Sequence, residues 1–114
     1  MAARVARIVL VAALACCVAL IAGCSAWQGA VLYGSGTGAL DRGEVFRAVD
    51  DLERAAALVP QASEIQNHLG LAYTAAGRDD DALVAFQRAV DLDCENVAAQ
   101  RNLSKAERAA RSSP

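Results

Sequence analysis

Charged side chains are absent from residues 8–40, and this feature restricts the fold more than any other. All 13 acidic residues follow this stretch, from Asp41 onward. The chain of 114 residues therefore joins an apolar amino-terminal segment to one small charged domain. Alanine occupies 27 positions and aromatic residues account for 4%, so the composition favours helices over strands and excludes an all-β sandwich.

The amino-terminal segment has the order of a secretory signal. Arg4 and Arg7 are followed by the apolar residues 8–22, and then by small side chains that fit a peptidase cleft. A transmembrane helix needs about 20 apolar residues to cross the hydrocarbon layer. The segment reaches that length only if the small residues before Trp27 are included, so an uncleaved single-pass anchor stays an alternative.

Four residues at the end of the apolar core, Ile21, Ala22, Gly23 and Cys24, resemble the lipobox of bacterial lipoproteins. The resemblance implies that residues 1–23 are a signal peptide, that the Cys24 thiol is diacylated, and that the new amino terminus is acylated. Several acyl chains anchor a protein stably, because each buried CH₂ contributes about 0.8 kcal/mol. Ser25 follows the cysteine, which in Gram-negative families implies an outer-membrane lipoprotein facing the periplasm. The alternative is an ordinary cleavage site at Cys24.

The remaining cysteines predict no disulfide. Cys16 and Cys17 lie in the apolar core, and Cys94 is the one cysteine of the charged domain. A single cysteine cannot form an intramolecular disulfide, so this domain depends on packing alone. We expect Cys94 to be a small packed side chain at a helix end.

A repeat of 34 residues is visible in the charged domain. Moving residues 43–60 forward by 34 positions aligns seven pairs, of which six keep their character. The pairs are Gly43 with Gly77, Val45 with Asp79, Ala48 with Ala82, Val49 with Leu83, Leu52 with Phe86, Ala55 with Ala89 and Leu58 with Leu92.

The second copy, residues 63–96, resembles the tetratricopeptide repeat, a pair of helices with a fixed order of small and large residues. The residues that carry the resemblance are Leu69, Gly70, Tyr73, Gly77, Ala82, Phe86 and Ala89. The resemblance implies an all-α fold, a short α-solenoid of about two helix pairs and a terminal capping helix.

The periodicity of apolar residues independently predicts these helices. Residues three and four apart share a helix face, and two such faces follow one another in this copy. They are Leu69, Ala72, Tyr73 and Ala76, and then Leu83, Phe86, Ala89 and Val90. Ala82 and Ala89 are small enough to let two helix axes approach closely. We expect helices over residues 44–59, 64–76, 79–92 and 97–110, and a disordered tail at 111–114.

Capping residues predict the helix ends. Ser63 and Gln66 have the spacing of a capping box at the start of the helix at 64–76. Gly77 suits the left-handed residue that ends this helix, and Asn96 suits the amino-terminal cap of the last helix.

The upstream copy is weaker. Residues 43–62 contain an amphipathic helix that matches the second helix of a repeat, but residues 24–42 hold four glycines, Gly29, Gly34, Gly36 and Gly38. Each glycine costs a helix about 1 kcal/mol relative to alanine. We expect a frayed or irregular first helix here. The alternative is a flexible, lipid-anchored tether, with Trp27 near the bilayer interface.

Tetratricopeptide arrays bind peptides along the first helix of each pair, so the resemblance also implies a binding groove. The candidate groove residues are Asn67, Leu71, Thr74 and Ala75 on the middle helix, and Arg101, Lys105 and Arg108 on the last. The three basic residues share a helix face and favour an acidic partner. A plain solvated face is the alternative for them.

The residue inventory favours a binding protein over an enzyme. His68 is the one histidine, and no nucleophile and base can be paired with it in sequence. We expect His68 to be a partly buried contact residue, with partner binding or pH sensing as the alternative. No metal or cofactor motif is found, and a net charge of −2 gives no basic footprint for nucleic acid.

The sequence thus predicts a membrane-tethered adaptor that binds a protein or peptide segment in envelope, pilus or secretion assembly. The alternative is a structural subunit that forms a homodimer or joins a larger complex, since stacked repeats need about three units for stability.

Overall fold

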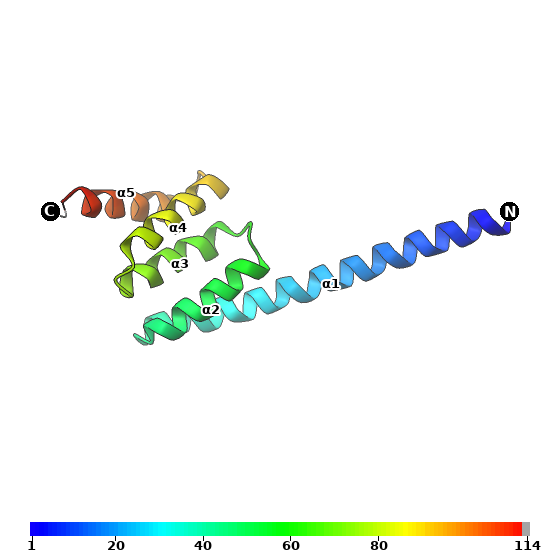
Figure 1. Ribbon diagram of the computed structural model, residues 1–114, viewed down its shortest axis with the longest axis horizontal. Helices are drawn as coiled ribbons and strands as arrows, with labels where there is room; N and C mark the ends of the chain where they lie inside the picture. Colours follow the sequence, from blue (N-terminus) through cyan, green and yellow to red (C-terminus); the bar gives the residue numbers. More distant parts are fainter. Residues whose placement is uncertain (113–114) are drawn as a thin grey trace.

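The computed structural model describes residues 1–112, except for the side chains of Ile21 and Ala22. Over these residues the protein is all-α, as predicted. Its helices are α1 (Ala2–Asp41), α2 (Val45–Leu58), α3 (Ser63–Ala75), α4 (Asp79–Leu92) and α5 (Val97–Ser112). Each helix packs against the next, which gives a helical repeat of two pairs, α1–α2 and α3–α4, followed by α5 (Figure 1).

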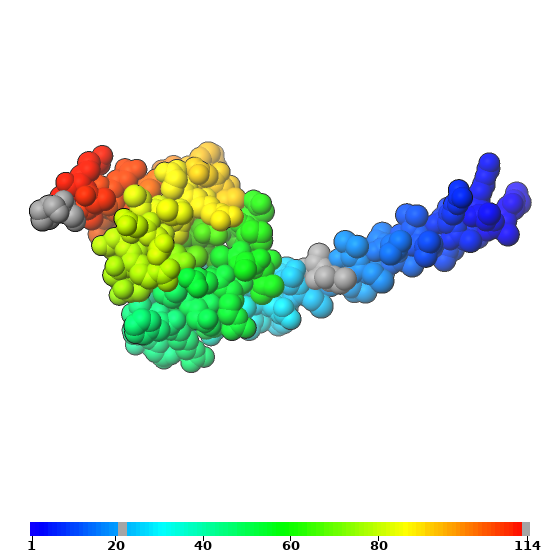
Figure 2. Space-filling model, in the orientation of Figure 1, coloured from blue at the N-terminus to red at the C-terminus, as the bar shows by residue number. Residues whose placement is uncertain are grey.

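The amino-terminal half of α1 projects away from the other helices (Figures 1 and 2). The projection gives the molecule its extents of 74 × 28 × 21 Å. Residues 1–20, 23 and 24 are exposed. Among the residues whose burial is described, Gly29 is the first that is buried. An 18-residue window of α1 has a mean hydropathy of 2.7, so the helix is long and apolar enough to cross a membrane. A signal sequence near the amino terminus also passes this test of length and composition, so both sequence interpretations fit α1.

The carboxyl-terminal half of α1 is a regular helix, so the expected irregularity and the flexibility of the alternative tether are both wrong. Two of the glycines explain this outcome. A Cβ atom at Gly36 would lie 2.7 Å from Leu52 Cγ, and one at Gly29 would collide with Val59. These glycines therefore let α2 pack directly on the backbone of α1, and the apolar burial that results offsets their helix cost.

The 34-residue repeat is present in the packing of the two pairs. Gly70, 34 residues after Gly36, meets Phe86 as Gly36 meets Leu52, and a Cβ at Gly70 would lie 2.5 Å from Phe86 Cε1. The turns repeat too, since Gly43 has φ +74° and Gly77 has φ +72°. The left-handed conformation expected for Gly77 is confirmed.

The core is built from small residues on every helix and a few large ones. Its buried apolar residues are Ala39, Ala48, Val49, Leu52, Ala55, Ile65, Leu69, Ala72, Ala82, Ala85, Phe86, Ala89 and Ala99. The predicted contact alanines, Ala82 and Ala89, are 1% and 0% exposed, which confirms that the helices approach closely there.

Of two predicted helix caps, the structure contradicts one and confirms the other. Ser63 is not a cap but the first residue of α3, and its hydroxyl donates to the carbonyl oxygen of Ala89 at 2.8 Å. The capping-box prediction is therefore wrong, because the hydroxyl serves a contact between helices. The cap at Asn96 is confirmed, since the Ala99 amide donates to Asn96 Oδ1 at 3.0 Å.

Two further predictions need correction. Cys94 is not packed but exposed in the turn between α4 and α5, where its backbone carbonyl oxygen accepts a hydrogen bond from the Gln100 side chain. The helix α5 extends through Ser112, so residues 111 and 112 are not a disordered tail. The rest of that predicted tail, residues 113–114, lies outside the described residues.

Candidate functional site

Polar pairs connect the first helices of successive pairs, α1, α3 and α5. The Tyr33 hydroxyl lies 3.1 Å from His68 Nδ1, and the two rings meet edge to face. Asn102 Nδ2 donates to Asn67 Oδ1 at 2.8 Å. Both pairs span 35 residues, so the repeat uses the same contact twice. His68 is half-buried, which confirms it as a polar contact residue.

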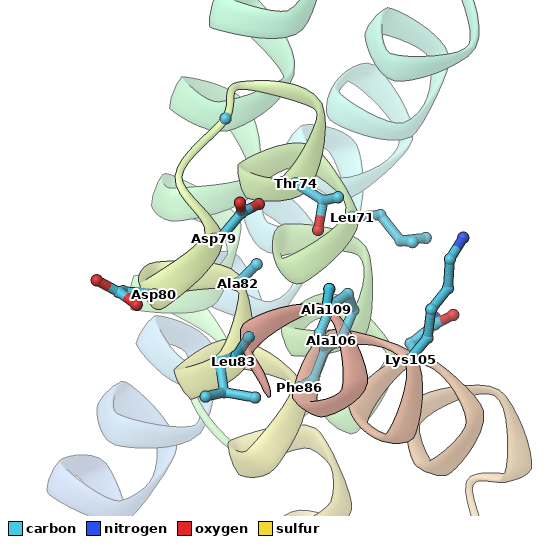
Figure 3. A pocket seen from close by; sticks show the side chains of 13 residues that line it. Leu71, Thr74, Asp79, Asp80, Ala82, Leu83, Phe86, Lys105, Ala106 and Ala109 are labelled. Atoms are coloured by element: carbon cyan, nitrogen blue, oxygen red, sulfur yellow. The ribbon is translucent and has the colours of Figure 1, made fainter. Parts of the chain in front are cut away.

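A hollow of about 500 Å³ opens between α3, α4 and α5 (Figure 3). Apolar side chains from α3 and α4 form one wall, and alanines from α5 form the other. They include Leu71, Leu83 and Phe86, and Ala106, Ala109 and Ala110. Ala99 is the one buried residue of α5, so only the start of this helix is closely packed. Farther along, alanine side chains are too short to fill the space to α4, and the hollow remains.

The hollow contains some of the predicted groove residues and leaves out others. Leu71, Thr74 and Lys105 line it. Asn67 does not, because it is 5% exposed and bonded to Asn102, which itself lines the hollow. The other three predicted residues, Ala75, Arg101 and Arg108, are exposed but are not part of the lining.

Acidic residues at the start of α4 also line the hollow, although they are not among the predicted site residues. Asp79 and Asp80 lie on the α4 side, whereas Lys105 lies on the α5 side. None of the three takes part in an ion pair within residues 1–112. Their position follows from Gly77, whose turn brings the first residues of α4 beside the end of α3. Acidic residues at a helix start are stabilised by the helix dipole, so sequence gave no separate signal for a site.

A second polar cluster connects the end of α3 and the turn that follows it to α2. The Tyr73 hydroxyl donates to Glu53 Oε1 at 2.7 Å, and Arg78 Cζ lies 4.4 Å from the centre of the Tyr73 ring. Arg78 also pairs with Asp81 at 2.7 Å. Burial, and next the hydrogen bond to Glu53, raise the pKa of Tyr73 to about 12. The cluster holds neighbouring helices together.

Cys24, the predicted lipidation residue, lies outside the core. Its side chain is exposed on α1, five residues before the buried Gly29. Five residues of helix span about 7.5 Å. A group attached to Cys24 would therefore lie close to the folded domain without touching its core.

No protein-family model matches the chain, and no curated protein sequence matches it. The lining of the hollow determines what it can bind. Alkyl and aromatic side chains provide apolar contact, and charged groups on its two sides provide orientation. An apolar hollow with a few polar groups is the arrangement of binding sites, which typically enclose about 300–1,000 Å³.

Proposed function

We propose that this chain is a membrane-anchored adaptor of the tetratricopeptide class, which binds a protein or peptide segment in the bacterial cell envelope. Pilus or secretion assembly is the setting that we expect. The observation that carries the proposal is the double role of α1, which is apolar and exposed over residues 8–20 and packed in the helical repeat from Gly29 onward. The repeated contacts of Gly36 with Leu52 and Gly70 with Phe86 support the class, since helix pairs of this family contain small residues at fixed positions.

In this proposal the anchor is a lipid on Cys24, and the outer membrane, on its periplasmic side, is the location. Residues 1–20 and 23 are exposed, so removing the segment before Cys24 would take no described side chain from the core. Gly23 has open space around its Cα and weakens the helix by about 1 kcal/mol relative to alanine. This helps the helix to open for a peptidase at the Gly23–Cys24 bond.

The anchor would also orient the domain. Gly29 contacts Val59 just after α2 ends, and α3 then runs away from that end over 13 residues, or about 20 Å. The hollow lies at the far end, beside Gly77. A partner in the periplasm could therefore reach the hollow without obstruction by the membrane.

The anchor is tested by Cys24→Ala, with Cys94→Ala as the matched control, since Cys94 is equally an exposed cysteine. We expect Cys24→Ala to leave the precursor uncut and to abolish labelling with a radioactive fatty acid, whereas Cys94→Ala is processed and labelled normally. Normal processing of Cys24→Ala would refute the lipid anchor.

Binding is tested with a photo-crosslinking amino acid placed in the full chain in its native membrane. Thr74 is exposed in the hollow, and Val84 is 68% exposed on α4 outside it. We expect a discrete crosslinked protein from position 74 and none from position 84. Equal crosslinking at both positions would contradict the hollow as the binding site, and a crosslink to a second copy of the chain would favour the structural subunit instead.

A further inference from the structure

The two sides of the hollow carry opposite charges. Asp79 and Asp80 belong to the first turn of α4, and Lys105 belongs to the second half of α5. Figure 3 shows Asp80 and Lys105 on opposite sides, with alanines of α5 between them. All three side chains are exposed and belong to no ion pair over residues 1–112, so their charges are available to a ligand.

The basic side extends beyond the hollow. Arg101 and Arg108 lie four residues before and three residues after Lys105, so they share its face of α5. Both are exposed. A ligand in the hollow would thus meet a row of positive charges along α5 and a pair of negative charges on α4. A wholly acidic ligand would place negative charge next to Asp79 and Asp80, and a wholly basic ligand would place positive charge next to Lys105. Both would be repelled on one side of the hollow.

The lining between these charged residues is apolar and can contact aliphatic side chains of a ligand. Leu71, Leu83 and Phe86 face the short side chains of Ala106 and Ala109. Phe86 is only 2% exposed and packs on Gly70, so the aromatic ring is fixed and cannot move to fill the space. A volume of about 500 Å³ accepts a short peptide segment.

We propose that the hollow binds a peptide segment of mixed charge, which inserts aliphatic side chains between α3, α4 and α5. A basic side chain of the peptide lies toward Asp79 and Asp80, and an acidic side chain lies toward Lys105. This inference rests on the proposed function and specifies its ligand class. The sequence predicted an acidic partner, but the basic residues lie on one side of the hollow only. We therefore expect a partner that carries both charges.

The test selects peptides from a phage-displayed random library on the full chain in nanodiscs, after removal of phage that bind empty nanodiscs. We expect enrichment of aliphatic residues with a basic residue on one flank and an acidic residue on the other. An enriched synthetic peptide is then measured by fluorescence anisotropy. Thr74→Arg, which fills the hollow from an exposed position, should abolish its binding.

Charge variants test each side separately. Asp79→Asn with Asp80→Asn should remove the preference for a basic flank, and Lys105→Gln should remove the preference for an acidic flank. Each should weaken binding of the peptide by about twofold to fivefold, as exposed charge pairs do. Asp50 is an exposed aspartate on α2, so Asp50→Asn is the matched control. It should change neither the preference for charged flanks nor the affinity for the peptide.

The outcomes separate the two proposals. Enriched peptides that share no charge pattern, or that bind Thr74→Arg and the charge variants as tightly as the original chain, would overturn the mixed-charge inference while leaving the adaptor function standing. A library that yields no peptide above the empty-nanodisc background would count against peptide binding itself.

Discussion

Two glycines of α1 that lie two residues apart should respond oppositely to the same substitution. In Gly34→Ala the new methyl group meets nothing within 4 Å. This variant should gain the helix propensity of alanine, about 1 kcal/mol. In Gly36→Ala the methyl group would lie 2.7 Å from Leu52 Cγ and 3.3 Å from Asp51 Cβ. Leu52 is fully buried and has no space to move into, so overpacking should cost about 1–3 kcal/mol. Gly36→Ala gains the same helix propensity as Gly34→Ala, and the overpacking cost is subtracted from that gain.

The free energy of unfolding of Gly36→Ala should therefore lie about 1–3 kcal/mol below that of Gly34→Ala. Urea titration of the full chain in detergent micelles, followed by circular dichroism, measures this difference. In a thermal melt it corresponds to several degrees, since about 1 kcal/mol shifts the melting temperature of a domain of this size by about 4–8 °C. The pair is matched because both changes act on the same helix and on the same unfolded chain. Equal stability of the two variants would refute the close packing of α1 on α2.

Three further predictions concern contacts inside the repeat. Tyr73→Phe removes the hydrogen bond to Glu53. Because the pKa of Tyr73 is raised to about 12 in the folded chain from an ordinary value of 10.0, the stabilisation by this tyrosine is complete below pH 10 and is lost as the pH rises through 12. Urea titrations across this pH range should therefore show a smaller loss of unfolding free energy in Tyr73→Phe than in the original chain. Ala82→Leu should destabilise the chain by about 1–3 kcal/mol, and an unchanged melting temperature would contradict the close approach of its helices. Asn102→Ala leaves the buried Asn67 Oδ1 without its donor and should cost about 1–3 kcal/mol, and Asn102→Asp, which keeps the size of the side chain but has no N–H to donate, should cost at least as much.

Helix positions in the charged domain were predictable because they depend on local patterns. The helix at 79–92 was predicted with both ends correct, and the expected helix at 64–76 lies one residue earlier in the structure. Leucine, alanine and aromatic residues at helical spacing, together with Gly77 and Asn96 at the ends, specify these elements within about 20 residues of chain. Such signals do not require knowledge of any neighbouring helix.

The effect of the α1 glycines depends on a neighbouring helix and not on local sequence. Considered alone, Gly29 and Gly36 weaken a helix, and an irregular segment was the reasonable prediction. Their effect reverses once α2 packs on them, because the missing side chains make room for Val59 and Leu52. The repeat itself held an unused signal, since Gly36 and Gly70 occupy the same position 34 residues apart.

The division of the chain, the all-α class and the 34-residue repeat follow from the amino-acid sequence, because charge pattern, composition and apolar spacing are properties of the chain alone. The candidate site, in contrast, depends on how the helices pack together. Asn67 is buried against Asn102, whereas Asp79 and Asp80 lie beside the hollow opposite Lys105. These outcomes depend on how α5 packs on α3 and α4, with the start of α5 closely packed and its alanines leaving space farther along. The orientation of one helix against two others is set by the fit of side chains from all three, and no local pattern in the sequence records it.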